Sequence, residues 1–124
     1  MAFLADYILD LALAELDTAT STLWITSAEA TSYAEASSTY ALGSKTSLSI
    51  GSPADRVASG NGRKVTVAAI TDGAVSATGT ATHWAITKSG TTLMATGALA
   101  SSQSVTNGNT FTLGAFDIGI PDAV

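Results

Sequence analysis

Short segments of alternating apolar and polar residues, separated by Gly-containing turns, fill residues 63–120 of the chain. In the first segment, residues 64–70, Val65, Val67 and Ala69 share one face, and this period of two is typical of a β-strand. Asp72-Gly73 follows the segment. Because both residues tolerate positive φ, Asp-Gly between two such runs predicts a tight hairpin turn. We therefore expect the strand to reverse there and return over residues 74–81.

The next alternating segment, residues 82–87, places Thr82, Trp84 and Ile86 on one face, which we expect to face the core. Lys88-Ser89-Gly90 has the composition of a turn. Residues 91–99 alternate again, so the two segments should pair as a hairpin.

Asn107-Gly108 predicts another tight turn. After it, Phe111 and Leu113 lie on one face of the chain, whereas the following apolar residues, beginning at Phe116, occupy the opposite parity. One extra residue in a strand would keep both sets on the core side. We therefore expect a β-bulge near Gly114-Ala115.

The N-terminal part of the chain has the periodicity of an amphipathic helix over Ala2–Leu16. Phe3, Tyr7 and Leu11 belong to an apolar stripe with Leu4 and Ile8, whereas Asp6 and Asp10 mark an acidic side. Such a helix either covers an open edge of the sheet or packs on a second subunit or another partner. The two carboxylates, one turn apart, repel each other unless a cation lies close, although a solvated face also accommodates them.

Between the helix and the hairpins the pattern is less regular. Residues 21–27 predict a strand inside the sheet, with Leu23 and Ile25 on one side. Residues 28–42 suggest a long loop with a helical turn at residues 33–36, and residues 45–50 a further strand. Gly51–Gly62 is rich in turn residues, so we expect a loop without a packed element.

The predicted fold is therefore mainly β, an antiparallel β-sandwich or jelly-roll-like domain with one N-terminal α-helix. We assign residues 1–20 to the helix and residues 21–124 to a single β domain, since 124 residues suffice for one modest core.

The composition indicates a weakly charged surface. Charged residues make up 12% of the chain, about half the usual share, and the formal net charge is −5. Five basic residues are too few for a phosphate-binding surface, so we expect no nucleic-acid partner. No apolar run is long enough to span a bilayer, and we expect no membrane partner. Such a surface fits either strands with Ser and Thr on their solvent faces or a subunit covered by its neighbours.

Arg56, Arg63 and Lys64 are three of the five basic residues, and they lie in or beside the loop at residues 51–62. This basic loop is either simply solvated or the part of the chain that meets an acidic neighbour. With the stripe residues Phe3, Tyr7 and Leu11, these three are our candidates for a protein interface.

The sequence predicts no enzyme and no cofactor. His83 is the sole histidine and there is no cysteine, which excludes a metal site with two imidazoles or with thiolates in one chain. Gly60-Asn61-Gly62 lacks the glycine spacing of a phosphate-binding loop. The four aromatic residues at strand positions, Trp24, Trp84, Phe111 and Phe116, could form a carbohydrate platform, but their alternation favours core packing.

Several stretches of the chain resemble a family of small virion proteins of tailed bacteriophages. The likeness lies in residues 27–43, 78–86, 93–99, 108–113 and 116–121. The resemblance implies a β-rich, non-enzymatic subunit assembled in many copies. On this basis we expect a capsid decoration or cement protein on the virion surface that binds the major capsid protein and forms a homo-oligomer, most simply a trimer. The alternative is a tail or fibre component acting as adaptor, tip or host-glycan binder.

Overall fold

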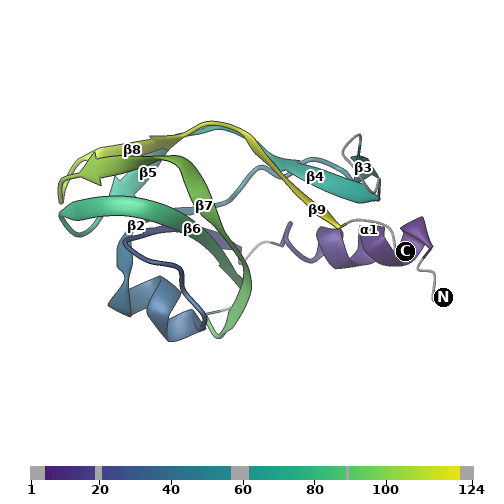
Figure 1. Ribbon diagram of the computed structural model, residues 1–124, viewed down its shortest axis with the longest axis horizontal. Coiled ribbons are helices and arrows are strands. Elements are labelled where there is room, and N and C mark those ends of the chain that lie inside the picture. The colour runs from purple at the N-terminus through teal and green to yellow at the C-terminus, as the bar shows by residue number, and fades with distance from the viewer. Residues whose placement is uncertain (1–4, 19–20, 57–61, 89, 121–124) are drawn as a thin grey trace.

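The computed structural model describes residues 5–18, 21–56, 62–88 and 90–120, and it shows a mainly β, antiparallel fold (Figure 1). This confirms the predicted fold class, with curled sheets in a sandwich-like arrangement. The elements in chain order are α1 (Asp6–Ala14), β1 (Thr22–Thr26), the π-helix η1 (Glu35–Thr39), β2 (Ala41–Thr46), β3 (Ala54–Asp55), β4 (Arg63–Val67), β5 (Ile70–Val75), β6 (Gly79–Lys88), β7 (Thr92–Val105), β8 (Thr110–Leu113) and β9 (Phe116–Ile120).

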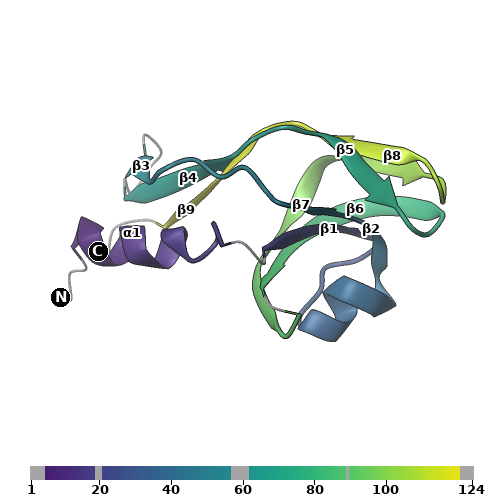
Figure 2. The same ribbon diagram turned by 180° about the vertical axis from the view of Figure 1, so that it is seen from behind.

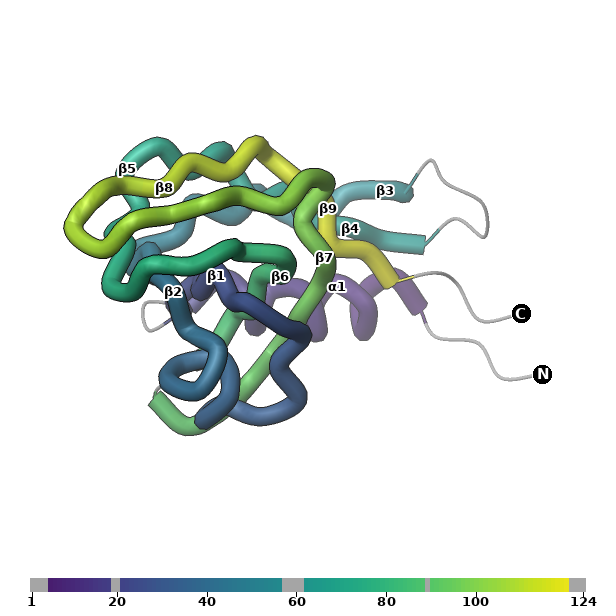
Figure 3. The backbone as a smooth tube through the Cα atoms, turned by 60° about the vertical axis from the view of Figure 1, so that its left-hand side comes forward, coloured from purple at the N-terminus to yellow at the C-terminus, as the bar shows by residue number. Residues whose placement is uncertain are grey.

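The strands form two sheets. A six-stranded sheet has the order β7-β6-β1-β2-β5-β8, and a three-stranded sheet has the order β3-β4-β9. Strand β1 lies between β6 and β2, which confirms that residues 21–27 contribute an interior strand. The larger sheet curls strongly, so that its two edge strands β7 and β8 approach each other (Figure 3).

Two segments, residues 63–75 and residues 110–120, run antiparallel and pass from one sheet to the other at the same level. In the small sheet Val67 pairs with Phe116, and in the large sheet Ile70 pairs with Leu113. Each of the two segments therefore changes sheet across two residues, which are 68–69 in the first segment and 114–115 in the second (Figure 2). The bulge predicted near Gly114-Ala115 is wrong in kind. The change of parity occurs there, but it marks this exchange of sheets.

The predicted turn at Asp72-Gly73 is also wrong, because both residues lie inside β5. Gly73 pairs with Phe111, whose ring is buried to 1% exposure and lies directly over the Gly73 backbone. A Cβ atom at Gly73 would overlap that ring. Glycine is needed here for the close approach of an aromatic ring, a requirement that the Asp-Gly pair does not distinguish from a turn.

The later hairpin predictions agree with the structure. Strands β6 and β7 pair antiparallel, and β7 extends beyond the expected Leu99 to Val105. Asn107-Gly108 forms the turn between β7 and β8, with Gly108 at φ 92°. Trp84 is partly buried and packs against the main core, as expected for its face.

The middle of the chain is more ordered than its composition suggests. The helical turn expected at residues 33–36 is present and continues through η1 to Thr39. Strand β2 begins at Ala41, within the expected loop, and ends at Thr46, so the strand predicted at residues 45–50 is misplaced. In the loop at residues 51–62, Ala54–Asp55 forms β3, which pairs with β4.

The helix α1 is shorter than predicted, and its buried face is a different one. It begins at Asp6 and ends at Ala14, while residues 1–4 lie outside the described part of the chain. Leu9 and Leu13 are buried at 2% exposure, and α1 contacts β4 and β9 of the small sheet. The helix therefore covers one sheet, as the first of our two alternatives proposed, while its other apolar face points outward.

We expect Gly73→Ala to lower the free energy of unfolding by about 1–3 kcal/mol, because the buried Phe111 ring cannot move aside without straining the core. Gly114→Ala is the matched control, since a Cβ atom there meets nothing within 4 Å. Urea denaturation of both variants measures the difference. Equal stability of the two variants would show that the ring is not held over Gly73.

Candidate functional site

The outer face of α1 carries an exposed apolar stripe, which we define as Tyr7, Ile8 and Leu11. Their exposed fractions are 69%, 45% and 49%, and they are the exposed large hydrophobic residues of the described chain. Two of them, Tyr7 and Leu11, are interface candidates from the sequence. The third sequence candidate on the helix, Phe3, lies outside the described residues.

Arg63 fixes α1 to the small sheet. Its Nε donates to Asp10 Oδ1 at 2.7 Å and its Nη2 to Asp10 Oδ2 at 3.2 Å, while Nη1 donates to Asp55 Oδ1 at 2.5 Å. These hydrogen bonds raise the pKa of the Arg63 guanidinium, that to Asp10 contributing most. The two-pronged contact is the geometry that favours arginine over lysine. A cation close to Asp6 and Asp10 would offset the repulsion between these carboxylates. Arg63 of the same chain supplies that cation at Asp10.

Lys64 and Arg56 also have roles within the fold. Lys64 Nζ lies 2.9 Å from Asp117 Oδ2, and the Thr66 hydroxyl donates to Asp117 Oδ1 at 2.6 Å. The Thr66 and Lys64 hydrogen bonds lower the pKa of Asp117. The Arg56 side chain lies over Gly119 of β9, and its backbone N–H donates to the Gly62 carbonyl at 2.9 Å.

The sequence candidates Arg56, Arg63 and Lys64 all lie on or beside the small sheet, but not on one face of it. Arg63 faces α1, whereas Lys64 and the Arg56 side chain over Gly119 lie on the opposite face. Residues 57–61 of the same loop lie outside the described part. The interface role that we expected for this basic loop stays a prediction. The structure adds that Arg63 and Lys64 already form ion pairs with carboxylates of their own chain.

The remaining cations are engaged as well. Lys45 pairs with Asp72 at 3.0 Å and Lys88 with Glu15 at 2.5 Å, and Arg56 also has a partner in the chain. The exposed carboxylates of Asp6, at the start of α1, and of Asp17, shortly after its end, have no ion pair among the described residues. The charge left for the surroundings is therefore negative.

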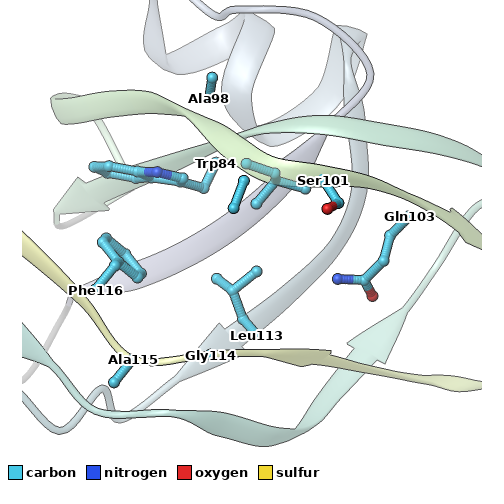
Figure 4. A pocket seen from close by; sticks show the side chains of 10 residues that line it. Trp84, Ala98, Ser101, Gln103, Leu113, Gly114, Ala115 and Phe116 are labelled. Atoms are coloured by element: carbon cyan, nitrogen blue, oxygen red, sulfur yellow. The ribbon is translucent and has the colours of Figure 1, made fainter.

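A second feature that the sequence did not reveal is a cleft of about 300 Å³ between β7 and the junction of β8 with β9. Trp84, Leu99, Leu113 and Phe116 give it an apolar lining, and Gln103 adds an amide (Figure 4). The residues that line the cleft come from several different strands. Only the curl of the sheet, which the alternation of residues does not specify, brings them together.

His83 has a local structural role. Its Nδ1 lies 2.8 Å from the Thr82 hydroxyl, and its Nε2 lies 3.9 Å from Glu29 Oε2.

Within the described part of the chain, no three His, Cys, Asp or Glu side chains are grouped so that they could hold a metal ion. No helix in those same residues is long and apolar enough to cross a membrane.

The four strand aromatics all have contacts within the fold. Phe111 is buried, and Trp24 Nε1 donates to the Thr87 hydroxyl at 2.9 Å. The Trp84 indole lies against the Gly97 backbone, and the Phe116 ring lies 4.7 Å away between centroids.

Comparisons with protein-family models, with curated proteins and with solved structures found no match to this chain.

We expect Asp117→Asn to lower the melting temperature at pH 7 and to have progressively less effect in acid. Because the pKa of folded Asp117 lies below its ordinary value of 3.8, its ionised form stabilises the fold fully above that pH. This contribution is lost as the pH falls through the lower, folded value. Thermal denaturation from pH 7 down to pH 2 measures it.

Asp6→Asn is the control for this prediction, because it removes one carboxylate that has no ion pair among the described residues. A gap between wild type and Asp117→Asn that stays constant across the pH range would contradict the assignment of the lowered pKa.

Proposed function

We propose that this chain is a non-enzymatic structural subunit of a bacteriophage virion, a capsid decoration or cement protein that binds the major capsid protein. The observation that carries the proposal is the exposed apolar stripe on α1. Tyr7, Ile8 and Leu11 stand together on one side of the helix, whereas the opposite side already holds the helix on its own sheet. Grouped apolar residues of this kind mark surfaces that another protein covers.

The charge distribution supports the same function. Each cation of the chain is engaged by its own fold, so few basic groups remain to bind the phosphates of DNA. With charged residues at 12% of the chain, the surface is suited to burial against neighbouring subunits. The resemblance of the sequence to small virion proteins gives this assembly its setting.

In such a role the subunit acts through contact area. Each contact gains about 25 cal/mol per Å² of apolar surface removed from water, less the cost of ordering the partners. A subunit that bridges two capsid proteins gains further, because its second contact forms at high effective concentration. Many modest contacts would then resist the outward pressure of packaged DNA.

The location of the chain is tested by its copy number in purified virions, measured by quantitative mass spectrometry after heads and tails are separated. We expect hundreds of copies that travel with the heads. A few copies with the tails would instead indicate an adaptor, tip or fibre, and absence from both fractions would remove the structural role.

The role of the stripe is tested by Tyr7→Gln combined with Leu11→Gln. Both positions are exposed, and glutamine is a good helix former, so the free energy of unfolding should change by no more than about 0.5 kcal/mol. Binding to heads stripped of this subunit should weaken at least tenfold, which corresponds to about 1.4 kcal/mol or more.

The control for this experiment is Thr80→Gln combined with Ser104→Gln, two exposed and mutually paired positions on β6 and β7. Equal occupancy of heads by the stripe variant and the control variant would show that the stripe is not the capsid-facing or subunit-facing surface.

A further inference from the structure

The cleft exists because the two edges of the curled sheet face each other without pairing. Strands β7 and β8 leave the same turn, yet they are the opposite edges of the six-stranded sheet. One side-chain hydrogen bond joins them, from Gln103 Nε2 to the Thr112 carbonyl at 2.8 Å. A side chain is needed there because the strands are further apart than the ladder spacing of about 4.8 Å.

Both walls of the cleft are irregular. In the register of β6 and β7, Ala81 pairs with Gln103 and His83 with Ala98, so that residues 99–102 lie opposite Thr82 alone. On the other wall, Gly114-Ala115 is the crossing between the sheets. A bulge of this kind re-aims side chains, and such bulges are common beside functional sites.

The cleft is closed at one end by Gln103 and at the other by the contact of Trp84 with Phe116, whose ring centroids are 4.7 Å apart. Leu113 lies between them (Figure 4), and Leu99 also lines the cleft. The lining contains no charged residue, and Ser101 and Gln103 supply its polar side chains. Its volume, about 300 Å³, is at the lower end of ligand pockets and suits one neutral ring with a polar substituent.

We propose that this cleft receives Tyr7 of a second copy of the chain. Tyr7 is the one aromatic residue among the exposed large hydrophobics of the described structure, at 69% exposure. A phenol matches the lining, since its ring is apolar and its hydroxyl can exchange hydrogen bonds with the side chains of Ser101 and Gln103. Ile8 and Leu11, beside it on α1, would then pack on the rim.

The contact must join different copies. Tyr7 is mostly exposed and therefore does not fill the cleft of its own chain. Because the projecting residue and the cleft lie on different parts of the molecule, each copy offers both halves of a heterologous contact, which closes into a ring or continues as a filament. The stripe contains no cation, and the lining of the cleft is uncharged. Two chains that each carry a net charge of −5 can therefore make this contact without bringing like charges together in the cleft.

This inference makes a second copy of the chain, rather than the capsid protein, the direct partner of the stripe, and it rests on the proposed function only for its setting in a virion. It is tested on the purified chain without virions, so that its failure is distinct from failure of the head-binding experiments. Sedimentation equilibrium of the wild type should show oligomers above the 12.4 kDa of one chain. Tyr7→Ser removes the projecting ring, and Ser101→Trp fills the cleft from an exposed position.

Each of these variants alone should be monomeric, with the melting temperature of the wild type as the check on folding. An equimolar mixture should form dimers and nothing larger, because one variant keeps an open cleft and the other keeps its tyrosine. Tyr7→Phe, which retains the ring, should still self-associate.

Two results would overturn the proposal. The first is a monomeric wild type at the highest soluble concentration, even if p-cresol, a mimic of the tyrosine side chain, binds the cleft, because the occupant would then belong to another protein. The second is self-association that is abolished by Leu11→Gln but not by Tyr7→Ser, with no dimer in the mixture of Tyr7→Ser and Ser101→Trp. This result would indicate that two copies meet through their stripes in a symmetric contact.

Discussion

The antiparallel ladder between residues 63–75 and residues 110–120 can change sheets only if both strands do so at the same level. If one strand crossed earlier, the pairs Val67 with Phe116 and Ile70 with Leu113 could not both form. The common crossing places the small sheet beside the large one. It thereby provides the surface on which α1 packs and leaves the unpaired Gly114-Ala115 wall of the cleft. The position of the helix and the presence of the cleft thus both follow from the requirement that the two strands change sheets at the same level.

The electrostatics follow from the same arrangement. The small sheet presents Arg63 to Asp10 on the helix and to Asp55 on β3, so one guanidinium with a 17% exposed side chain connects three elements. Because the other cations are engaged too, the outward surface is apolar on the stripe and acidic at the ends of the helix. A surface of this composition selects against polyanions and for neutral protein contacts.

Local periodicity was sufficient to predict the fold class, a strand at residues 21–27 and the hairpin of β6 with β7, because alternation within a segment is a local property. It failed where distant residues decide. Gly73 looks like a turn residue until the Phe111 ring is known to lie over it. The helix offers two apolar faces, and the one that carries Leu9 and Leu13 faces inward, where Asp10 meets Arg63 of the distant strand β4. Tyr7 and Leu11 were identifiable as interface candidates, whereas the cleft depends on sheet curvature and was not.

The pairing of Arg63 with Ile120 joins residues that lie far apart in the sequence, and so does the pairing of β1 with β6. Closing such long loops costs entropy before any contact compensates for it, so a chain with this topology folds slowly for its size. Until β9 arrives, β4 has an open edge and α1 has no complete sheet to cover. Pairing of β9 with β4 therefore completes the sheet beneath the helix, and only a subunit in which it has formed can present the stripe in a fixed orientation.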